Sequence, residues 1–340
     1  MPDERPPQAI VMQMVMAAWG AQTISTITRL GIPDLLDKHG PSTAVQLCDL
    51  GVDARPALLE RVLRACASLG ILTEDAGGRF GPTPLSAVLT ESGQGSVKQF
   101  VELIGGRWWP PIGRLADTVR DGQPAISTES AMSPAPVDPA HRRRFGRAMK
   151  SRMDSVRNVL ERVDFSGTRT VVDVGGGFGH LALAIARRYP TIRAVVLDLP
   201  DVAALGKEET AADDADVLGR VEFVGGDMFT DVPPGDLYVL KTIVHDWDDA
   251  SAVRVLRNCA GRVPAGGRVL CVDNVLPPMG DTGASGTKLL DMLMMVTLPG
   301  RERTEPEWRA LYDAAGLTLT SVTLLNPRSG ESVVEGVKRA

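Results

Sequence analysis

The sequence predicts an α/β protein in which a smaller helical domain precedes a doubly wound, mostly parallel sheet. Strand-like and helix-like segments alternate from residue 169 onward, which is typical of such a sheet. Residues 43–80 read instead as helix, helix and hairpin, the outline of a winged helix. Between the first strand and helix of the sheet lies a glycine-rich turn, at the edge where α/β folds present backbone N–H groups to a ligand.

The composition fits a globular chain with room for two domains. Its 340 residues are 44% hydrophobic and 23% charged. A net charge of −5 gives no reason to expect nucleic acid or an anionic membrane as a partner. No stretch approaches the roughly 20 apolar residues of a membrane span, and residues 10–19 lack the basic start of a signal peptide. We therefore expect a cytoplasmic protein.

The cysteines support the same expectation. None of the four is arranged in a C-x-x-C pair, and all fall within predicted helices or strands: Cys48, Cys66, Cys259 and Cys271. This pattern is typical of reduced core thiols in a cytoplasmic protein.

Apolar spacing predicts the elements of the first domain. Helices are expected over 10–40 (ending near Gly31 and Pro33), 43–50 and 55–69, and a hairpin over 71–80. In helix 55–69, the residues that recur at i, i+4, i+7 and i+11 predict one buried face: Leu58, Val62, Ala65 and Leu69.

Winged helices often bind DNA, so DNA binding and dimerisation are the two candidate functions of this segment. Helix 55–69 carries three arginines but also Glu60. The acidic pair Glu74 and Asp75 stands where a DNA-binding wing needs basic residues. A dimerisation module is therefore favoured.

The rest of the chain predicts a helical connection and then the sheet. Residues 95–150 look helical, with a Pro/Ser-rich break at 130–139. Strands are expected at 169–174, 193–198, 220–224, 236–241, 267–273, 317–324 and 332–338. Helices are expected at 179–189, 249–262 and 305–315, and the acidic stretch 207–216 is expected to be a solvated loop or helix end.

The glycine turn favours S-adenosylmethionine over a dinucleotide. Glycines stand at Gly175, Gly177 and Gly179, but the sixth position of a dinucleotide fingerprint is His180. Asp173, inside the preceding strand, places a carboxylate near something cationic rather than near a pyrophosphate. The amino group and sulfonium of S-adenosylmethionine are both positive.

Residues at the next strand ends fit an adenosine. Asp198 ends the second strand, where a carboxylate can accept both ribose hydroxyls. Asp227 and Met228 follow the third strand and suit an exocyclic amine and an adenine face. Taken singly, each has another explanation: Asp198 could be a helix N-cap, Asp227 a turn residue and Met228 a core residue.

His245 is the candidate general base. It follows the fourth strand, and its ordinary pKa of about 6.5 suits proton transfer near neutral pH. Asp273 and Glu302 could orient it, because a carboxylate on one ring nitrogen fixes the tautomer. Glu302 could instead pair with a neighbouring arginine, and Asp273 could belong to a strand-end turn.

Together these motifs resemble the S-adenosylmethionine-dependent O-methyltransferases, most closely the caffeic acid-type family of plants and antibiotic-producing bacteria. The matching motifs are Asp173–Gly179, Asp198-Leu199-Pro200, Gly226–Phe229, Lys241, His245-Asp246-Trp247 and Gly300–Thr304. The resemblance covers essentially the whole chain. It implies a Rossmann-like class I methyltransferase domain with a seven-stranded sheet, and a homodimer formed by the N-terminal domain. The expected boundaries are 1–95, 96–150 and 151–340.

The resemblance also implies roles for individual residues. His245 would deprotonate the acceptor hydroxyl, flanked by Asp273 (a Glu in the plant enzymes) and Glu302. The expected cofactor site comprises Asp173, Gly175, Gly177, Asp198, Leu199, Asp227, Met228, Lys241 and Trp247. The expected acceptor pocket comprises Trp108, Trp109, Phe145, Met149, Met153, Leu293 and Met294, each with core packing as the alternative. Met and aromatic walls suit a small aromatic or polyketide-like phenol from secondary metabolism, and no metal is expected.

Four alternatives remain open. A metal-dependent catechol methyltransferase would use Asp246, Asp273 and Asn274 as ligands, but His245 stands where its first carboxylate is wanted. Transfer to nitrogen would use the same base. Relatives that hydroxylate or decarboxylate generally have this histidine altered, whereas here it is intact. A winged-helix regulator that senses S-adenosylmethionine would need a basic face to recognise DNA, and the sequence predicts no such face in the N-terminal domain.

Overall fold

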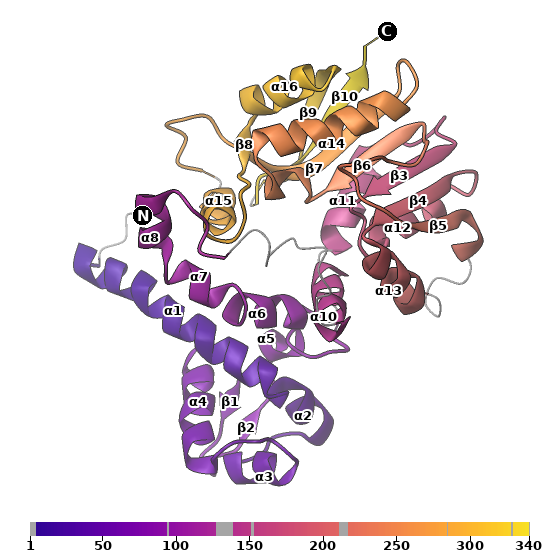
Figure 1. The fold of residues 1–340 in the computed structure, drawn as a ribbon. Coiled ribbons are helices and arrows are strands. Elements are labelled where there is room, and N and C mark those ends of the chain that lie inside the picture. Colours follow the sequence, from indigo (N-terminus) through magenta and orange to yellow (C-terminus); the bar gives the residue numbers. More distant parts are fainter. Residues whose placement is uncertain are drawn as a thin grey trace. The chain divides into compact units, whose positions relative to one another are not determined.

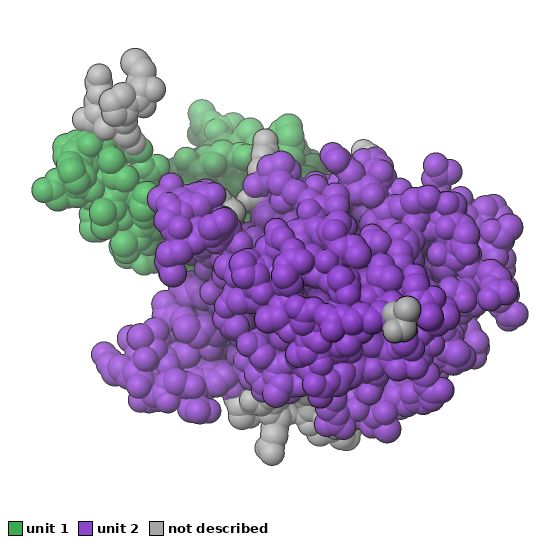
Figure 2. All heavy atoms as spheres, turned by 90° about the horizontal axis from the view of Figure 1, so that it is seen from above, with its two compact units in different colours: residues 1–110, 147–151 green, residues 111–146, 152–340 purple. Residues whose placement is uncertain are grey.

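The computed structural model describes residues 5–93, 95–126, 139–150, 153–210, 217–283, 285–327 and 329–339. The chain divides into two compact units, coloured separately in Figure 2. The first comprises residues 1–110 and 147–151, and the second residues 111–146 and 152–340. Helix α10 (Pro139–Lys150) contributes residues to both. The expected break at 130–139 lies almost wholly outside the described residues.

The first unit is helical with one small hairpin. Its helices are α1 (Pro7–Arg29), α2 (Ile32–His39), α3 (Ala44–Asp49), α4 (Pro56–Ser68), α5 (Pro84–Ala87) and α6 (Lys98–Gly105), and α7 (Trp109–Ile112) crosses its boundary. The hairpin pairs β1 (Thr73–Glu74) with β2 (Phe80–Gly81). The predicted order of helix, helix and hairpin is confirmed. Gly31, at φ +68°, separates α1 from α2, so the helix end expected near Gly31 is confirmed and α2 follows it within the segment 10–40.

The predicted buried face of α4 is wrong. The residues that pack into the core are Leu59, Leu63 and Cys66, whereas Leu58 and Leu69 are 52% and 50% exposed. The two sets lie on adjacent stripes of the helix and both recur at helical spacing. Spacing alone therefore could not decide which stripe faces α1 and α3, the helices that α4 contacts.

Helix α1 corrects the expectation that no stretch could span a membrane. Among the described residues it is the one helix long and apolar enough by length and composition, with a mean hydropathy of 1.2 over its best window. No charged residue lies between Arg5 and Arg29, and the few uncharged polar residues of α1 do not bring its hydropathy below that of a possible membrane span. Signal sequences and buried core helices meet the same criterion, but only 11% of this window is buried.

The second unit is built on one eight-stranded sheet (Figure 1). Its strands are β3 (Thr170–Val174), β4 (Arg193–Asp198), β5 (Val221–Gly225), β6 (Leu237–Lys241), β7 (Arg268–Leu276), β8 (Arg303–Thr304), β9 (Leu317–Asn326) and β10 (Glu331–Lys338). The order is β5-β4-β3-β6-β7-β10-β9, with β8 paired to β7 beside this path. Strands β3 to β7 are parallel, and β10 is antiparallel to both of its neighbours. The predicted doubly wound, mostly parallel sheet is confirmed, with β8 as an addition.

Helices cover both faces of this sheet. They are α11 (Met153–Arg162), α12 (His180–Arg188), α13 (Pro200–Thr210), α14 (Asp249–Arg262) and α16 (Glu305–Ala314). The second unit also contains α15 (Ser285–Thr297), which contacts β7, α8 (Leu115–Asp121), which contacts α15, and the short 3₁₀ turns η1 (Leu218–Arg220) and η2 (Val244–Asp246). Val172 and Leu240 share a core with α14 and α16, and Val171 and Val239 share one with α11 and α12. Because neighbouring strand residues point to opposite faces, β3 and β6 are buried on both sides, which explains why their sequences are largely apolar.

Helices α5, α11 and α15 were not predicted from the sequence. Helix α13 ends at Thr210, inside the acidic stretch 207–216, which agrees with the helix end expected there; residues 211–216 lie outside the described residues. All four cysteines are free, and three of them are buried.

Candidate active site

The glycine turn after β3 offers bare backbone at the carboxyl edge of the sheet. Gly175, Gly177 and Gly179 have φ values of +69°, +57° and +73°, a region that side chains rarely adopt. A Cβ on Gly175 would lie 2.5 Å from Cδ1 of Ile243, whereas one on Gly177 would meet nothing within 4 Å. The turn is therefore closely packed at Gly175 and open at Gly177, as a backbone ligand site requires.

Two carboxylates brace this turn. Asp173 is buried and its Oδ2 accepts from the backbone N–H of Ala182 at 3.3 Å. Burial raises the pKa of Asp173 to about 7, although the charge of Lys241, at the end of β6, opposes the shift. Asp198 accepts from the N–H groups of Gly177 (2.8 Å) and Leu199 (2.7 Å). Burial raises the pKa of Asp198 as well, against these two hydrogen bonds.

The remaining predicted cofactor residues surround the ends of β5 and β6. Asp227 is exposed, and its Oδ1 accepts from the N–H of Phe229 at 2.9 Å. Half-buried Met228 is held through its carbonyl, which accepts from Asn258 of α14 at 2.8 Å. The Trp247 ring meets Phe229 edge-on, with ring centroids 4.5 Å apart. Asn258 was missed, because nothing in the sequence links α14 to this loop.

His245 lies in η2, directly after β6, among three carboxylates. Its Nδ1 is 2.8 Å from Oε1 of Glu302 and 3.9 Å from Oδ1 of Asp273. Its Nε2 is 3.4 Å from Oδ1 of Asp246. The structure thus brings together the three residues proposed from the sequence and adds Asp246. The position of Asp246 directly after His245 is the signal in the sequence that points to this contact.

Burial and charge compete within this cluster. Burial alone would lower the pKa of His245, but Asp273, Asp246 and hydrogen-bonded Glu302 outweigh it and raise that pKa to about 9. Burial raises the pKa of Asp273 to about 7 and that of Asp246 to about 6. Both oxygens of Asp273 and Oε2 of Glu302 find no hydrogen-bond partner within the described part of the chain. The arrangement is a buried imidazole whose protonated form is strongly stabilised.

The segment before β8 holds this histidine from one side. A Cβ on Gly300 would lie 1.9 Å from the carbonyl oxygen of His245, so only glycine allows this approach. The backbone N–H of Glu302 donates to Oδ1 of Asp291, on α15, at 2.8 Å. Asp291 was also missed by sequence reasoning, because α15 itself was not predicted.

The predicted acceptor residues are distributed over both units. Leu293 (half-buried) and Met294 (buried) lie on α15, and Phe145 on α10 is 44% exposed. Three others belong to the first unit: Trp108, Trp109 and Met149. The side chain of Met153 lies outside the described residues. One shared pocket for these seven residues stays a prediction.

The metal-ligand set of the catechol alternative is not assembled. Among the residues that the structure describes, no three His, Cys, Asp or Glu side chains are grouped to hold a metal. Asn274 follows Asp273 on β7, so its side chain points to the opposite face of the sheet. There Nδ2 of Asn274 donates to the carbonyl of Ser329 at 2.6 Å.

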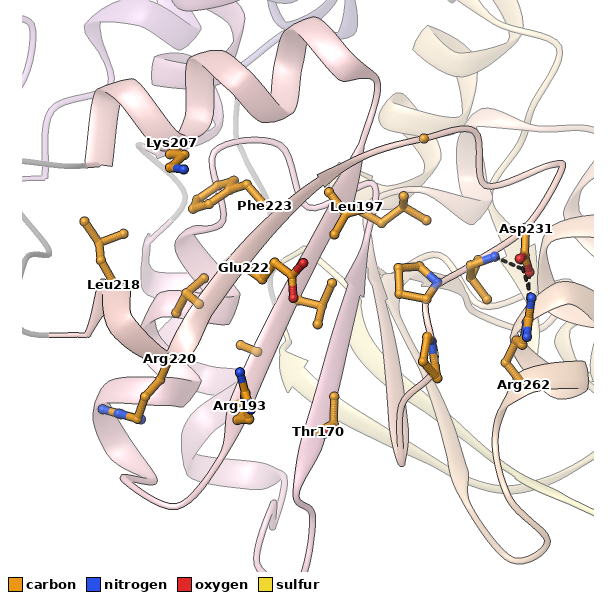
Figure 3. Close-up of a pocket in the computed structure, with 18 of the residues that line it drawn as sticks. Thr170, Arg193, Leu197, Lys207, Leu218, Arg220, Glu222, Phe223, Asp231 and Arg262 are labelled. Atoms are coloured by element: carbon orange, nitrogen blue, oxygen red, sulfur yellow. Dashed lines mark hydrogen bonds and ion pairs between the residues drawn. The ribbon is translucent and has the colours of Figure 1, made fainter.

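A hollow of about 1140 Å³ lies along the edge strand β5, and the predicted cofactor residue Asp227 is among those that line it (Figure 3). It is lined by residues of β4 and β5 and by the loop after β5, where Asp231 pairs with Arg262. No member of the histidine cluster lines it. This hollow is therefore not the acceptor site.

Comparison with protein families identifies both parts of the chain. The family model of the O-methyltransferase domain matches residues 113–318. The model of the O-methyltransferase dimerisation domain matches residues 12–92.

Similar proteins span nearly the whole chain. Phenazine O-methyltransferase PhzM of Lysobacter antibioticus is 36% identical over 335 residues, covering 97% of this chain and 96% of that protein. Mitomycin biosynthesis 6-O-methyltransferase of Streptomyces lavendulae is 34% identical, covering 90% and 88%. Caffeic acid 3-O-methyltransferase 1 of Ocimum basilicum is 31% identical, covering 92% and 91%.

Solved structures share the fold. The crystal structure of LaPhzM superposes with a TM-score of 0.89 at 34% identity, covering 98% of this chain and all of the other. Human N-acetylserotonin methyltransferase in complex with S-adenosylmethionine gives 0.88 at 25% identity, with both chains fully covered. The N,N-8-amino-8-demethyl-D-riboflavin dimethyltransferase RosA of Streptomyces davawensis gives 0.79 at 28% identity, covering 98% and 100%.

Proposed function

Since the chain belongs to the S-adenosylmethionine-dependent O-methyltransferases, we propose that it methylates a phenolic hydroxyl of a small aromatic natural product, with His245 as the general base. The family membership rests on both family models and on relatives that match almost the full length. The observation that supports the base is the contact of 2.8 Å between His245 Nδ1 and Glu302, which leaves Nε2 for the acceptor.

The described residues fit the cofactor. The open backbone at Gly177 and the carboxylate of Asp198 suit an adenosine with its ribose hydroxyls. Asp227 and Met228 would contact the adenine, with Trp247 beside them. Asp173, Gly175, Leu199 and Lys241 complete the predicted set. S-adenosylmethionine supplies a methyl group on a positively charged sulfonium, and a human relative of the same fold contains it.

The cluster explains how a phenol would lose its proton. Glu302 accepts from Nδ1–H, which fixes the tautomer and leaves the lone pair on Nε2. A phenol has a pKa of about 10, and the raised pKa of His245, about 9, lies close to it. The small difference favours transfer of the hydroxyl proton to Nε2. Burial of the cluster excludes water, so much of the rate would come from alignment and proton removal.

The acceptor is assigned by class only. The relatives named above are a phenazine O-methyltransferase and an enzyme of mitomycin biosynthesis, which supports an aromatic secondary metabolite here. Transfer to nitrogen is the second candidate, because RosA is a dimethyltransferase whose named substrate carries an amino group. An amine acceptor would use the same base and pocket.

A homodimer through the first unit is part of the proposal. The dimerisation model covers residues 12–92. On α1, large apolar side chains stand half or more exposed in the single chain, including Met14 (70%), Trp19 (65%) and Val11 (57%). Helix α1 would bury them against a second copy. The expectation of a cytoplasmic protein stays a prediction.

A methyl-transfer screen tests the proposal. The purified chain is incubated with isotopically labelled S-adenosylmethionine and a panel of phenols, hydroxyquinones and matched aromatic amines. Label in phenolic products supports O-transfer, and label confined to amines supports the second candidate. No label from any acceptor, with cofactor binding shown by calorimetry, would count against both.

A further inference from the structure

Arg303, next to the histidine cluster, is a fully buried cation whose hydrogen-bonding capacity is filled. Its side chain is 0% exposed. Nε donates to Asp249 at 2.9 Å, Nη1 to the carbonyls of Val244 (3.1 Å) and Arg301 (3.3 Å), and Nη2 to the carbonyl of Trp247 at 2.7 Å. Nη2 also lies 2.8 Å from Asp249. The five N–H groups of a guanidinium thus meet five interactions.

The carbonyls of Val244 and Trp247, which accept hydrogen bonds from Arg303, lie on either side of His245 and Asp246 in the sequence. Val244 directly precedes His245, and Trp247 directly follows Asp246. One planar group therefore holds both ends of the turn that presents the imidazole. Arg303 is itself fixed, because its strand β8 pairs with β7 at Val275, two residues after Asp273. The guanidinium ties the strand of one flanking acid to the turn of the base.

Arg303 also supplies positive charge to a cluster rich in carboxylates. The groups that face His245 are Asp246 on η2, Asp273 on β7 and Glu302 just before β8, all acidic. Arg303 lowers the pKa of Asp273, against the larger effect of burial. Its other charged neighbour, Asp249, stands at the start of α14 and also pairs with Arg301. The Trp308 ring of α16 lies 6.0 Å from the guanidinium carbon.

We propose that Arg303 is a positioning residue for the base: its planar fork fixes the turn that carries His245 and Asp246, and its charge balances the acids around the imidazole. This inference rests on the proposed role of His245. A lysine could not replace it, because an ammonium offers three donors from one point, whereas the acceptors here are spread around a plane.

The test compares Arg303→Lys and Arg303→Met with the matched control Arg301→Met. Arg301 also pairs with Asp249, but its side chain is 45% exposed and donates to neither carbonyl of the turn. Each variant is measured for kcat against pH, for S-adenosylmethionine affinity by calorimetry and for thermal stability. The imidazole of His245 is titrated by NMR, which is practical because the chain has four histidines.

We expect Arg303→Lys to lose about 10- to 100-fold in kcat, because small misplacements of reacting groups are costly, with the acid limb of the pH profile unchanged. Arg303→Met should lose more in kcat. The acid limb of its pH profile and the pKa of His245 measured by NMR should both move to higher pH. The reason is that a nearby positive charge disfavours the protonated imidazole, so removing the guanidinium favours the imidazolium of His245. The control Arg301→Met should keep wild-type values.

Wild-type kcat and an unshifted His245 titration in folded Arg303 variants would overturn the proposal. So would an equal loss in Arg301→Met. If Arg303→Met does not fold, Asp249→Asn takes its place, because Asp249 is 53% exposed and its loss frees one edge of the guanidinium. A fall of about threefold or more in kcat, beyond that of Arg301→Met, supports the proposal. The NMR titration needs no turnover, so it tests Arg303 even if His245 is not the base.

Discussion

Nδ1 of His245 and Oε1 of Glu302 lie 2.8 Å apart in a fully buried setting, and this contact decides which ring nitrogen is available for chemistry. Glu302 accepts from Nδ1–H, so Nε2 carries the lone pair. Nε2 is directed away from Glu302 and lies 3.4 Å from Asp246. The orientation of the base therefore depends on a residue 57 positions away in the sequence.

Replacing Glu302 by glutamine should separate its charge from its shape. Glu302→Gln keeps the size of the side chain but removes one of the anions that raise the pKa of His245. We expect kcat at high pH to fall about 10- to 1000-fold, because the tautomer is less well fixed. The acid limb should move to lower pH. Steady-state kinetics across the pH range measure both effects.

Glu305→Gln is the matched control for that variant. Glu305 lies three residues away and pairs with Arg309 on the exposed side of α16. It should leave kcat and the pH profile unchanged. Wild-type kcat and pH dependence in Glu302→Gln would contradict the proposed role of Glu302 in orienting His245.

The activity of the wild-type chain should rise with pH well beyond neutrality. The rate needs neutral His245, and the neighbouring carboxylates raise its pKa to about 9 despite burial. Below that pH most imidazole is protonated, so kcat/KM for the acceptor should climb about tenfold per pH unit and level off near pH 9. A profile that is already flat from pH 6.5 upward would contradict this.

Asp246→Asn should also shift the acid limb of the pH–rate profile. Removing its carboxylate deletes one of the anions that stabilise the imidazolium. We therefore expect the acid limb to shift to lower pH, with cofactor affinity unchanged in calorimetry. An unshifted limb would mean that the 3.4 Å approach to Nε2 carries no electrostatic weight in solution.

Gly175→Val should abolish cofactor binding. The position has φ +69°, and a Cβ would already lie 2.5 Å from Ile243. We expect the affinity for S-adenosylmethionine, measured by calorimetry, to fall more than about 100-fold, or about 2.7 kcal/mol. Gly266→Val is the control, because Gly266 has φ +74° but open space around its Cβ position. It should lower the melting temperature and leave the affinity intact.

The sequence predicts the sheet well because its central strands are buried on both faces. Largely apolar segments such as 169–174 and 236–241 are followed by glycine or polar residues, so their ends can be recognised in the sequence. Parallel strands align these ends at one edge, which is why Asp198 and His245 could be placed there. The placement of these residues follows mainly from the topology that α/β sheets share.

Features that depend on packing partners could not be predicted. In α15, apolar residues run almost without interruption from Leu289 to Val296, so no helical period is visible. In α4, two adjacent apolar stripes compete, and contacts with α1 and α3 choose the one that contains Leu63. Arg303 looked like a partner for Glu302, whereas its hydrogen bonds go to Asp249 and to backbone carbonyls.

One comparison tests the central claim most directly: turnover of labelled S-adenosylmethionine by wild type and His245→Ala on the same phenolic acceptor, with cofactor affinity measured in both. The account predicts that the variant binds the cofactor within about threefold of wild type but loses at least about 100-fold in kcat, the usual contribution of a general base. Near wild-type turnover in a folded variant that binds the cofactor would contradict the assignment of His245.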